Sequence, residues 1–200
     1  MDPAPLRLYL IRHGETEWSL SGQHTGRTDL ALTPRGEDQA RGLEPMLRPI
    51  VFDHVLTSPV RRAQRTCALA GLGGSAEVEP DLAEWDYGDY EGRTSGDIRH
   101  DRPGWNVFRD GCPGGESVAA VTLRADRLIT HATSLSGNVA LFSSGQFGCS
   151  LATRWVGLPV LEAQHLMLGT ASVSVLCYNP AHPDLRVISH WNYSATDPLI

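Results

Sequence analysis

The short apolar run from Leu6 to Ile11, interrupted only by Arg7, constrains the fold more than any other feature of the chain. Consecutive apolar residues over this length are typical of a strand buried on both faces, as in a parallel or mixed sheet. The run ends at Arg12-His13-Gly14, so a cation, an imidazole and a glycine stand together where the strand stops. Open α/β sheets bind ligands at the carboxyl ends of their strands, so we expect a functional site there.

The two polar side chains at this strand end suit an anionic ligand. The Arg12 guanidinium is a fixed fork of donors that matches phosphate, and the His13 imidazole beside it is able to act as base, nucleophile or ligand. For an isolated Arg-His-Gly tripeptide, a histidine that faces solvent is the simpler interpretation. The rest of the sequence has to decide between the two.

Composition narrows the class of protein. A chain of 200 residues without a linker or repeat predicts one domain, residues 1–200. With 17 basic and 23 acidic residues the net charge is −6, which argues against nucleic-acid binding and makes any anion site a local basic focus. No stretch reaches the roughly 18 apolar residues of a membrane span, and Met1–Pro5 lacks the basic start of a signal peptide. We therefore expect a cytoplasmic protein that does not bind membranes.

The cysteines have no metal-ligand spacing and are expected to be free thiols: Cys67, Cys112, Cys149 and Cys177.

Helix and strand signals alternate along the chain. Thr33-Pro34 and Ser58-Pro59 each place a capping side chain before a proline, which is typical of a helix start. The second of these helices should present free N–H groups to a phosphate at the sheet edge. The pattern predicts a loop over 14–32, helices from 33 to about 47, from 58, and from 116 to about 134, short helices or loops over 91–112, strands at 53–57, 138–143, 171–177 and 185–191, and a loose tail from Tyr193.

Motifs in the chain resemble, in the same order, those of the histidine phosphatase superfamily, whose fold is that of the phosphoglycerate mutases. They are residues 10–18 (Leu-Ile-Arg-His-Gly-Glu-Thr-Glu-Trp), 25–30, 32–36, 57–63, 84–92 and 113–117. The resemblance covers nearly the whole chain. It implies a three-layer α/β/α sandwich with a mixed, mostly parallel central sheet. It also implies a small-molecule phosphomonoester as the partner and no metal or other cofactor, and the sequence leaves open whether the chain forms a homo-oligomer.

The resemblance also implies roles for four side chains. His13 would attack the phosphorus to form a phosphohistidine, while Arg12 and Arg62 neutralise the phosphoryl oxygens. Arg62 lies one helical turn after Ser58 and on the same helix face. Glu84 would give a proton to the leaving alcohol, which requires that burial raise its pKa.

Other residues are weaker candidates. Four carboxylates crowd residues 81–89, and only the resemblance selects Glu84, with Trp85 and Tyr87 as an apolar wall. Neutral donors for the substrate are expected on the 14–32 loop, from Ser19, Gln23 and Thr25. His100 and Trp105 are expected at the surface.

One position departs from the family pattern. Where the resemblance predicts Ser-His-Gly, the chain has Ser143-Ser144-Gly145, followed by Gln146. Ser144 and Gly145 stay candidates for contacting the substrate, but losing one donor to a transferring group typically costs about 10²- to 10³-fold in rate. Three interpretations stay open: a slower phosphatase for small phosphorylated metabolites, with sugar phosphates favoured; a phosphoester-binding or interaction protein without catalysis; and an altered version of an active phosphatase. A mutase is less favoured, because the 91–112 segment is short.

Overall fold

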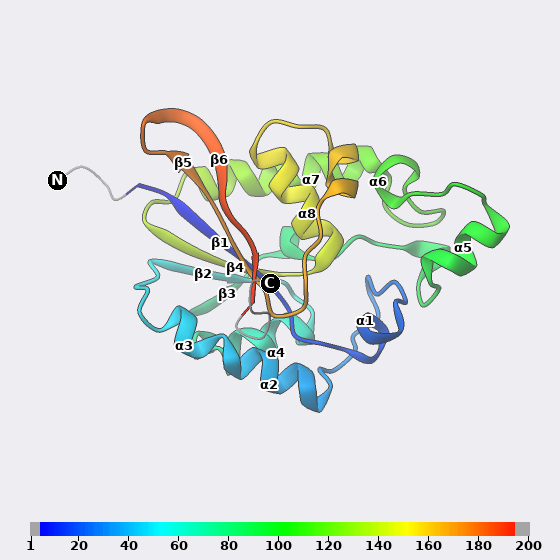
Figure 1. Cartoon of the computed structure of the whole chain (residues 1–200), viewed down its shortest axis with the longest axis horizontal. Coiled ribbons are helices and arrows are strands. Elements are labelled where there is room, and N and C mark those ends of the chain that lie inside the picture. Colours follow the sequence, from blue (N-terminus) through cyan, green and yellow to red (C-terminus); the bar gives the residue numbers. More distant parts are fainter. Residues whose placement is uncertain (1–4, 195–200) are drawn as a thin grey trace.

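The strands form one six-stranded sheet in the computed structural model, which describes residues 5–194 (Figure 1). The order across the sheet is β3-β2-β4-β1-β5-β6. Strands β1 to β4 run parallel, whereas β5 is antiparallel to both of its neighbours. The predicted mixed, mostly parallel sheet is therefore confirmed. The strands are β1 (Arg7–Arg12), β2 (His54–Thr57), β3 (Ala76–Val78), β4 (Asn138–Ser143), β5 (Val173–Asn179) and β6 (His182–Tyr193).

Helices cover both faces of the sheet, as Figure 1 shows. One face packs against α7 and α8, and the other against α2, α3 and α4. The helices are α1 (Glu17–Ser21), α2 (Pro34–Gly42), α3 (Glu44–Leu47), α4 (Arg61–Leu69), α5 (Ser95–Asp101), α6 (Val107–Asp110), α7 (Val118–Thr133) and α8 (Gly145–Trp155), with 3₁₀ turns at Gly73–Ser75, Pro80–Leu82, Gly88–Tyr90 and Val160–His165.

Strand β1 lies between β4 and β5 and contributes to the core on both of its faces. Leu8 and Leu10 pack into the cluster on the α7 and α8 side. Tyr9 and Ile11 pack into the cluster on the α2 to α4 side. Because side chains alternate along a strand, only a continuous apolar run can serve both layers at once, and this explains the run that begins at Leu6.

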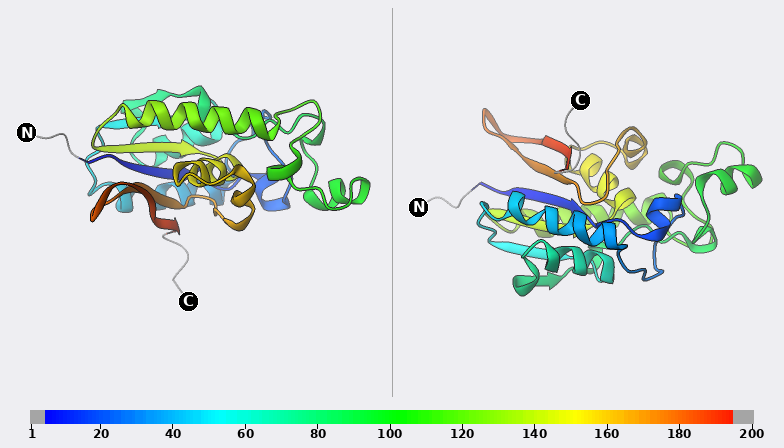
Figure 2. Two further views of the ribbon diagram at one scale, coloured as in Figure 1. Left: turned by 90° about the horizontal axis from the view of Figure 1, so that it is seen from above. Right: turned by 60° about the horizontal axis from the view of Figure 1, so that its bottom comes forward.

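Three neighbouring parallel strands end at one edge of the sheet. Thr57 of β2 is in register with Phe142 of β4, and Ser143 of β4 is in register with Arg12 of β1. Each strand is followed at once by polar residues. Figure 2 shows that α5 lies beyond this edge, at the opposite end of the molecule from the start of β1. The segments after the three strands are thus brought together, as expected for an open α/β sheet.

Two of the predicted elements are wrong in detail. The helix expected from 33 to 47 is interrupted at Leu43 and continues as α3, because Pro45 has no N–H to donate to the preceding turn. The 14–32 loop contains α1, which Thr16 caps through a reciprocal bond with Ser19.

The second predicted helix start is also wrong. Helix α4 begins at Arg61. Its N-cap residue is Val60, whose side chain forms no capping hydrogen bond. The Arg61 N–H instead donates to the carboxylate of Asp29, at 2.9 Å. Ser58 therefore does not cap α4, and its hydroxyl has no hydrogen-bond partner among the described residues.

The later elements follow the prediction more closely. Short helices occur within 91–112, and α7 begins at Val118 after a cap by Ser117. Strand β6 is longer than expected and includes Tyr193. Two sequence predictions fall largely outside the described residues. These are the absence of a signal-peptide start, which concerns residues 1–4, and most of the expected loose tail, residues 195–200.

The start of α2 packs directly against the chain that follows His13. A Cβ atom added to Gly36 would lie 2.1 Å from the carbonyl oxygen of Glu15, and one added to Gly14 would lie 2.3 Å from that of Gly36. Any side chain here would push α2 away from the strand end. The two glycines therefore allow the close approach that positions His13.

We expect Gly36→Ala to lower the free energy of unfolding by about 2 kcal/mol, because the methyl group overpacks a backbone contact. Gly42, the last residue of the same helix, serves as the control, because a Cβ atom added there would meet no other atom within 4 Å. Gly42→Ala should be neutral or stabilising by up to about 1 kcal/mol. Urea unfolding followed by circular dichroism measures both, and an unchanged stability of Gly36→Ala would contradict the proposed close contact.

Candidate active site

A hollow of about 210 Å³ opens at the carboxyl edge of the sheet. Its walls come from the end of β1, the 14–32 segment, the chain around Glu84, and the starts of α5 and α8. Six of the predicted site residues line it, whereas Arg62 and Ser144 do not; the six are Arg12, His13, Ser19, Gln23, Thr25 and Glu84. The structure therefore brings together residues that are up to 72 positions apart in the sequence, from 12 to 84.

His13 is held as a neutral imidazole with one free ring nitrogen. Its Nδ1 lies 2.7 Å from the carbonyl oxygen of Gly14, and since a carbonyl only accepts, Nδ1 carries the proton. Burial, together with the charges of Arg62 and Arg12, lowers the pKa of His13 well below its usual value of 6.5. Nε2 therefore keeps its lone pair at neutral pH, as a nucleophile requires.

Backbone carbonyls hold the two arginines of the site, of which Arg62 is buried and Arg12 half-buried. Arg62 donates to the carbonyl oxygens of Thr28 at 2.9 Å, and of Thr25 and Gly26 at 3.0 Å. Arg12 donates to the carbonyl oxygen of Leu168. Neither guanidinium forms an ion pair with a carboxylate within residues 5–194, so both keep their positive charge available to a ligand.

Four buried side-chain atoms in the described part of the chain have no hydrogen-bond partner: Arg12 Nε, Arg62 Nε, Ser58 Oγ and Ser144 Oγ. Ser58 directly follows β2, Ser144 directly follows β4, and Arg12 ends β1, so three of the four lie at adjacent strand ends. Buried polar atoms are nearly always paired, and each unpaired one costs about 1–3 kcal/mol. All four carry a hydrogen that they are able to donate.

Glu84 accepts three backbone N–H groups. Its carboxylate binds the N–H of Trp85 at 2.8 Å and those of Gln146 and Phe147 at 3.0 and 2.7 Å. The last two belong to the first turn of α8, so Glu84 caps this helix from a distant segment and lies at its positive end. The expected burial is present, but these donors match the ionised carboxylate, which only accepts.

The segment that carries Glu84 is fixed by Arg124, a residue that the sequence pattern did not reveal. Arg124 is buried on α7 and donates to the carbonyl oxygens of Asp81, Ala83 and Glu84. It also forms a two-pronged ion pair with Glu116, with N–O distances of 2.9 and 2.7 Å. Helix α7 was expected to serve mainly packing, because its apolar spacing gives no sign of a buried arginine. The structure shows that it also positions Glu84.

The three loop candidates line the hollow, but their side chains are bonded within the protein. Ser19 completes the cap of α1, the Gln23 amide donates to the carbonyl oxygen of Gly92 at 2.7 Å, and the Thr25 hydroxyl donates to that of Gln23 at 3.4 Å. Gly145 lines a neighbouring hollow instead. A Cβ atom at Gly145 would lie 3.3 Å from Cζ of Arg12, so this glycine leaves room for the guanidinium.

Other residues at the site were missed or misplaced. His24 lines the hollow and stacks on Tyr87 with a centroid distance of 4.4 Å, and no motif pointed to it. Trp105 was expected at the surface, as was His100, but only His100 is exposed. The Trp105 indole is buried and contacts His24 edge-on at 5.5 Å. The sequence did not predict the burial of Trp105, because this residue lies in an irregular segment and periodicity indicates burial only within regular elements.

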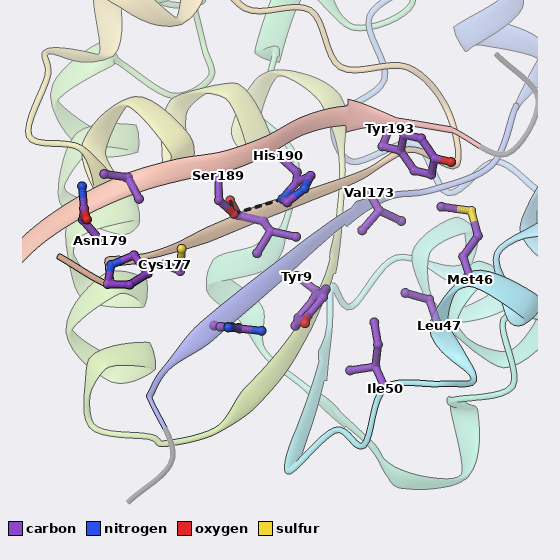
Figure 3. A pocket seen from close by; sticks show the side chains of 14 residues that line it. Tyr9, Met46, Leu47, Ile50, Val173, Cys177, Asn179, Ser189, His190 and Tyr193 are labelled. Atoms are coloured by element: carbon purple, nitrogen blue, oxygen red, sulfur yellow. Dashed lines mark hydrogen bonds between the residues drawn. The ribbon is translucent and has the colours of Figure 1, made fainter. Parts of the chain in front are cut away.

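A larger cavity, of about 700 Å³, lies elsewhere and is mainly apolar (Figure 3). It lies on the α3 side of the sheet, where Tyr9, Met46, Leu47, Ile50, His190 and Tyr193 gather around it. It contains none of the strand-end residues and no pair of cations. Size alone does not identify the site, since the smaller hollow is the one that contains Arg12, His13 and Glu84.

Within residues 5–194, no group of three or more His, Cys, Asp or Glu side chains is arranged to hold a metal ion. None of the helices in this range is long and apolar enough to cross a membrane. All four cysteines are buried free thiols.

Comparisons with known proteins give one family throughout. The family model of the histidine phosphatase superfamily (branch 1) matches residues 8–191. The chain is 43% identical over 186 residues to an acid phosphatase of Mycobacterium tuberculosis, covering 91% of each protein. It is 37% identical over 187 residues to the sedoheptulose 1,7-bisphosphatase of Saccharomyces cerevisiae, covering 77% of this chain and 69% of the yeast protein. The solved structure of the product of a Mycobacterium tuberculosis open reading frame superimposes with a TM-score of 0.89 at 40% identity, covering 94% of this chain and 98% of the other.

The buried His24 gives the site a measurable pH dependence of stability. Burial, and to a lesser extent the charge of Arg99, lowers the pKa of His24 from 6.5 to about 4. The unfolded chain therefore binds a proton that the folded chain excludes between these values, and stability is lost as the pH falls through this window. Between pH 7.5 and pH 5 we expect the free energy of unfolding to fall by about 2 kcal/mol more in the wild type than in His24→Phe.

Urea unfolding at the two pH values measures this difference. The exposed His100 on α5 provides the control, and His100→Phe should keep the pH dependence of the wild type. Identical losses in wild type and His24→Phe would show that His24 does not resist protonation in the folded protein.

Proposed function

The chain belongs to the histidine phosphatase superfamily, and from this premise we propose that it is a metal-independent phosphatase that hydrolyses small phosphomonoesters through a phosphohistidine on His13. The observation that carries the proposal is the neutral imidazole of His13, whose Nε2 is free and which lies close enough to Arg62 and Arg12 for their charges to lower its pKa further than burial alone does. The names of the relatives, an acid phosphatase and a sugar bisphosphatase, support the same class of reaction.

The first step follows from the positions of His13 and the two arginines. A phosphoryl group that accepts from Arg12 Nε, Arg62 Nε and the two serine hydroxyls has its negative charge neutralised before reaction. His13 Nε2 then attacks phosphorus, a P–N bond forms, and the P–O bond to the alcohol breaks. Because the donors are already in place, catalysis consists of positioning and electrostatic stabilisation.

Glu84 is the proton donor that this step needs. The departing alkoxide takes a proton from the Glu84 carboxyl group, which lines the same hollow. A phosphate ester dianion beside the carboxylate favours its protonated form, at the cost of one of the three N–H bonds that it now accepts. In the second step a water molecule gives its proton back to Glu84 and attacks phosphorus, the P–N bond breaks, and phosphate leaves.

Ser144 stands directly after β4, where the resemblance to the family predicts a histidine, and its hydroxyl is one of the unpaired donors. A hydroxyl donates one hydrogen bond and carries no charge, whereas a histidinium would supply both a donor and a charge. Chemistry is therefore expected to be slower than in a phosphatase with a histidine there. The serine at this position is what favours the second candidate, a protein that binds phosphoesters with little or no turnover.

The substrate class follows from the relatives and from the shape of the site. We propose small phosphorylated metabolites, with sugar phosphates first, since the yeast relative is named for one. The walls contributed by α1 and α5 are short helices, and the hollow is open to solvent rather than enclosed in the core. A mutase is less favoured, because a phosphohistidine reachable by water is lost to hydrolysis.

Brief incubation with a ³²P-labelled sugar phosphate should place acid-labile, base-stable phosphate on the wild-type protein. The label should be absent from His13→Ala, because that variant lacks the nucleophile. Continuous phosphate release in the presence of EDTA should equal that in its absence. Label that persists in His13→Ala would refute the assignment of the nucleophile, and phosphate binding without release from any substrate would support the binding protein instead.

The unpaired hydroxyl of Ser144 gives a separate prediction. Ser144→Ala removes a buried donor with no partner in the described chain, so the unliganded protein should be as stable as the wild type or slightly more stable. The same change should lower kcat by about 10- to 100-fold, because the transferring phosphoryl group loses a donor.

Thermal unfolding and single-turnover rates on one substrate measure the two effects. Ser143→Ala is the matched control, because the Ser143 hydroxyl is bonded to the carbonyl oxygen of Leu82 at 2.7 Å and its loss should reduce stability. A Ser144→Ala variant that is destabilised but fully active would mean that this hydroxyl serves the fold.

A further inference from the structure

We propose that Glu91 positions Arg62 for the phosphoryl group, although the two side chains form no ion pair, and that one peptide group transmits its effect. Because the contact between Arg62 and the phosphoryl group belongs to the proposed function, this role rests on that function. It makes Glu91 a positioning residue, a part that neither the motifs nor the steps derived above give to it.

The Glu91 carboxylate accepts from two backbone N–H groups of the 25–28 segment. The Gly26 N–H lies 2.9 and 3.0 Å from its two oxygens, and the Thr28 N–H lies 3.1 Å from one of them. Glu91 is half-buried and forms no ion pair with a basic side chain of residues 5–194. Backbone dipoles therefore hold this negative charge.

Arg62 binds the same segment through its carbonyl oxygens, those of Thr25, Gly26 and Thr28. The Thr25 carbonyl and the Gly26 N–H belong to one trans peptide group, in which the two point in opposite directions. Glu91 and Arg62 therefore lie on opposite sides of this peptide group. The anion is bound to its N–H and the cation to its carbonyl oxygen.

This arrangement holds the guanidinium and leaves part of it free. An anion at the N–H and a cation at the carbonyl oxygen polarise the peptide group in the same direction, which strengthens both hydrogen bonds. Burial lowers the pKa of Arg62, and the charges of Glu84, Asp29 and Glu91 oppose this, in that order. A direct ion pair would occupy donors of Arg62, whereas its Nε here has no partner among the described residues.

Gly26 allows the two segments to lie this close to each other. A Cβ atom added to Gly26 would lie 2.4 Å from the carbonyl oxygen of Trp85 and 3.0 Å from Oε2 of Glu91. The segment that holds Arg62 and the segment that continues from Glu84 to Glu91 therefore meet at this glycine.

Joining these two segments is the simpler role for Glu91, but backbone bonds already fulfil it. The Gly92 N–H donates to the carbonyl oxygen of His24, and the His24 N–H donates to that of Arg93, each at 2.9 Å. Neither bond needs a carboxylate. The place of a negative charge opposite Arg62 is therefore better explained by an effect on the cation.

The test measures the affinity for inorganic phosphate by calorimetry in the wild type, Glu91→Gln, Arg62→Met and the double variant. Glu91→Gln keeps the size of the side chain and removes its charge, and Arg62→Met removes both charge and donors. We expect Glu91→Gln to weaken phosphate binding about tenfold, because Arg62 is held less firmly. In the Arg62→Met background the same change should weaken binding by less than about twofold, because Glu91 acts through Arg62.

Asp89 provides the matched control, because it lies two residues before Glu91, is exposed, and has a carboxylate without a partner among the described residues. Asp89→Asn removes one negative charge and should leave phosphate binding unchanged. Where Arg62→Met binds phosphate more weakly than the wild type, three results would overturn the proposal. They are an unchanged affinity in Glu91→Gln, an equal loss in Asp89→Asn, and an equal effect of Glu91→Gln in the Arg62→Met background.

A second measurement does not depend on phosphate. In NMR spectra of the unliganded protein, the guanidinium N–H groups of Arg62 should exchange with water about tenfold faster in Glu91→Gln than in the wild type or Asp89→Asn. Unchanged exchange would overturn the role of Glu91 and leave the phosphatase standing. This comparison also decides the role of Glu91 if Arg62→Met does not fold.

The two measurements together separate this role from the proposed function. Faster exchange in Glu91→Gln, combined with a phosphate affinity that Arg62→Met does not change, would refute the contact between Arg62 and the phosphoryl group. The positioning of Arg62 by Glu91 would then stand without the proposed function.

Discussion

Two guanidinium groups without a carboxylate partner among the described residues, Arg62 buried and Arg12 half-buried, are the constraint on which the site depends. Buried charges are normally paired, because desolvation is costly. Here the carbonyl oxygens of the 25–28 segment and of Leu168 hold Arg62 and Arg12 in place of carboxylates. Carbonyl dipoles orient the cations but do not cancel their charge. Burial and, after it, the positive charges of Arg62 and Arg12 lower the pKa of His13, and the same charges attract an anion, so a neutral imidazole and an anion-attracting field arise from one arrangement.

The acidic side of the site is supported separately. Glu84 accepts from the first turn of α8, and Arg124 fixes its backbone from α7. A carboxylate held by three N–H groups cannot move freely. The start of α8 thus links the end of β4, where Ser144 lies, to the Glu84 carboxylate through the N–H groups of Gln146 and Phe147.

Local pattern predicted the fold well where one kind of interaction dominates. The apolar run at β1, the strand Asn138–Ser143 and the long helix α7 follow from burial alone, and each was predicted within about two residues. It failed where a distant contact competes with a local signal. Ser58-Pro59 has the composition of a helix start, but Asp29 takes over the cap from another segment, and the helix begins at Arg61.

The sequence by itself determined that a cation and an imidazole stand at the end of a buried strand. The reason is that a run of consecutive apolar residues predicts both the burial and the length of that strand. Its resemblance to a family selected Arg62 and Glu84 as well. Only the tertiary structure decided which donors have no partner. The Ser144 hydroxyl, for example, is unpaired because no acceptor from elsewhere in the described fold lies within hydrogen-bond distance of it. Tertiary structure also decided that His24 and Arg99 line one hollow, because the two residues are 75 positions apart in the sequence.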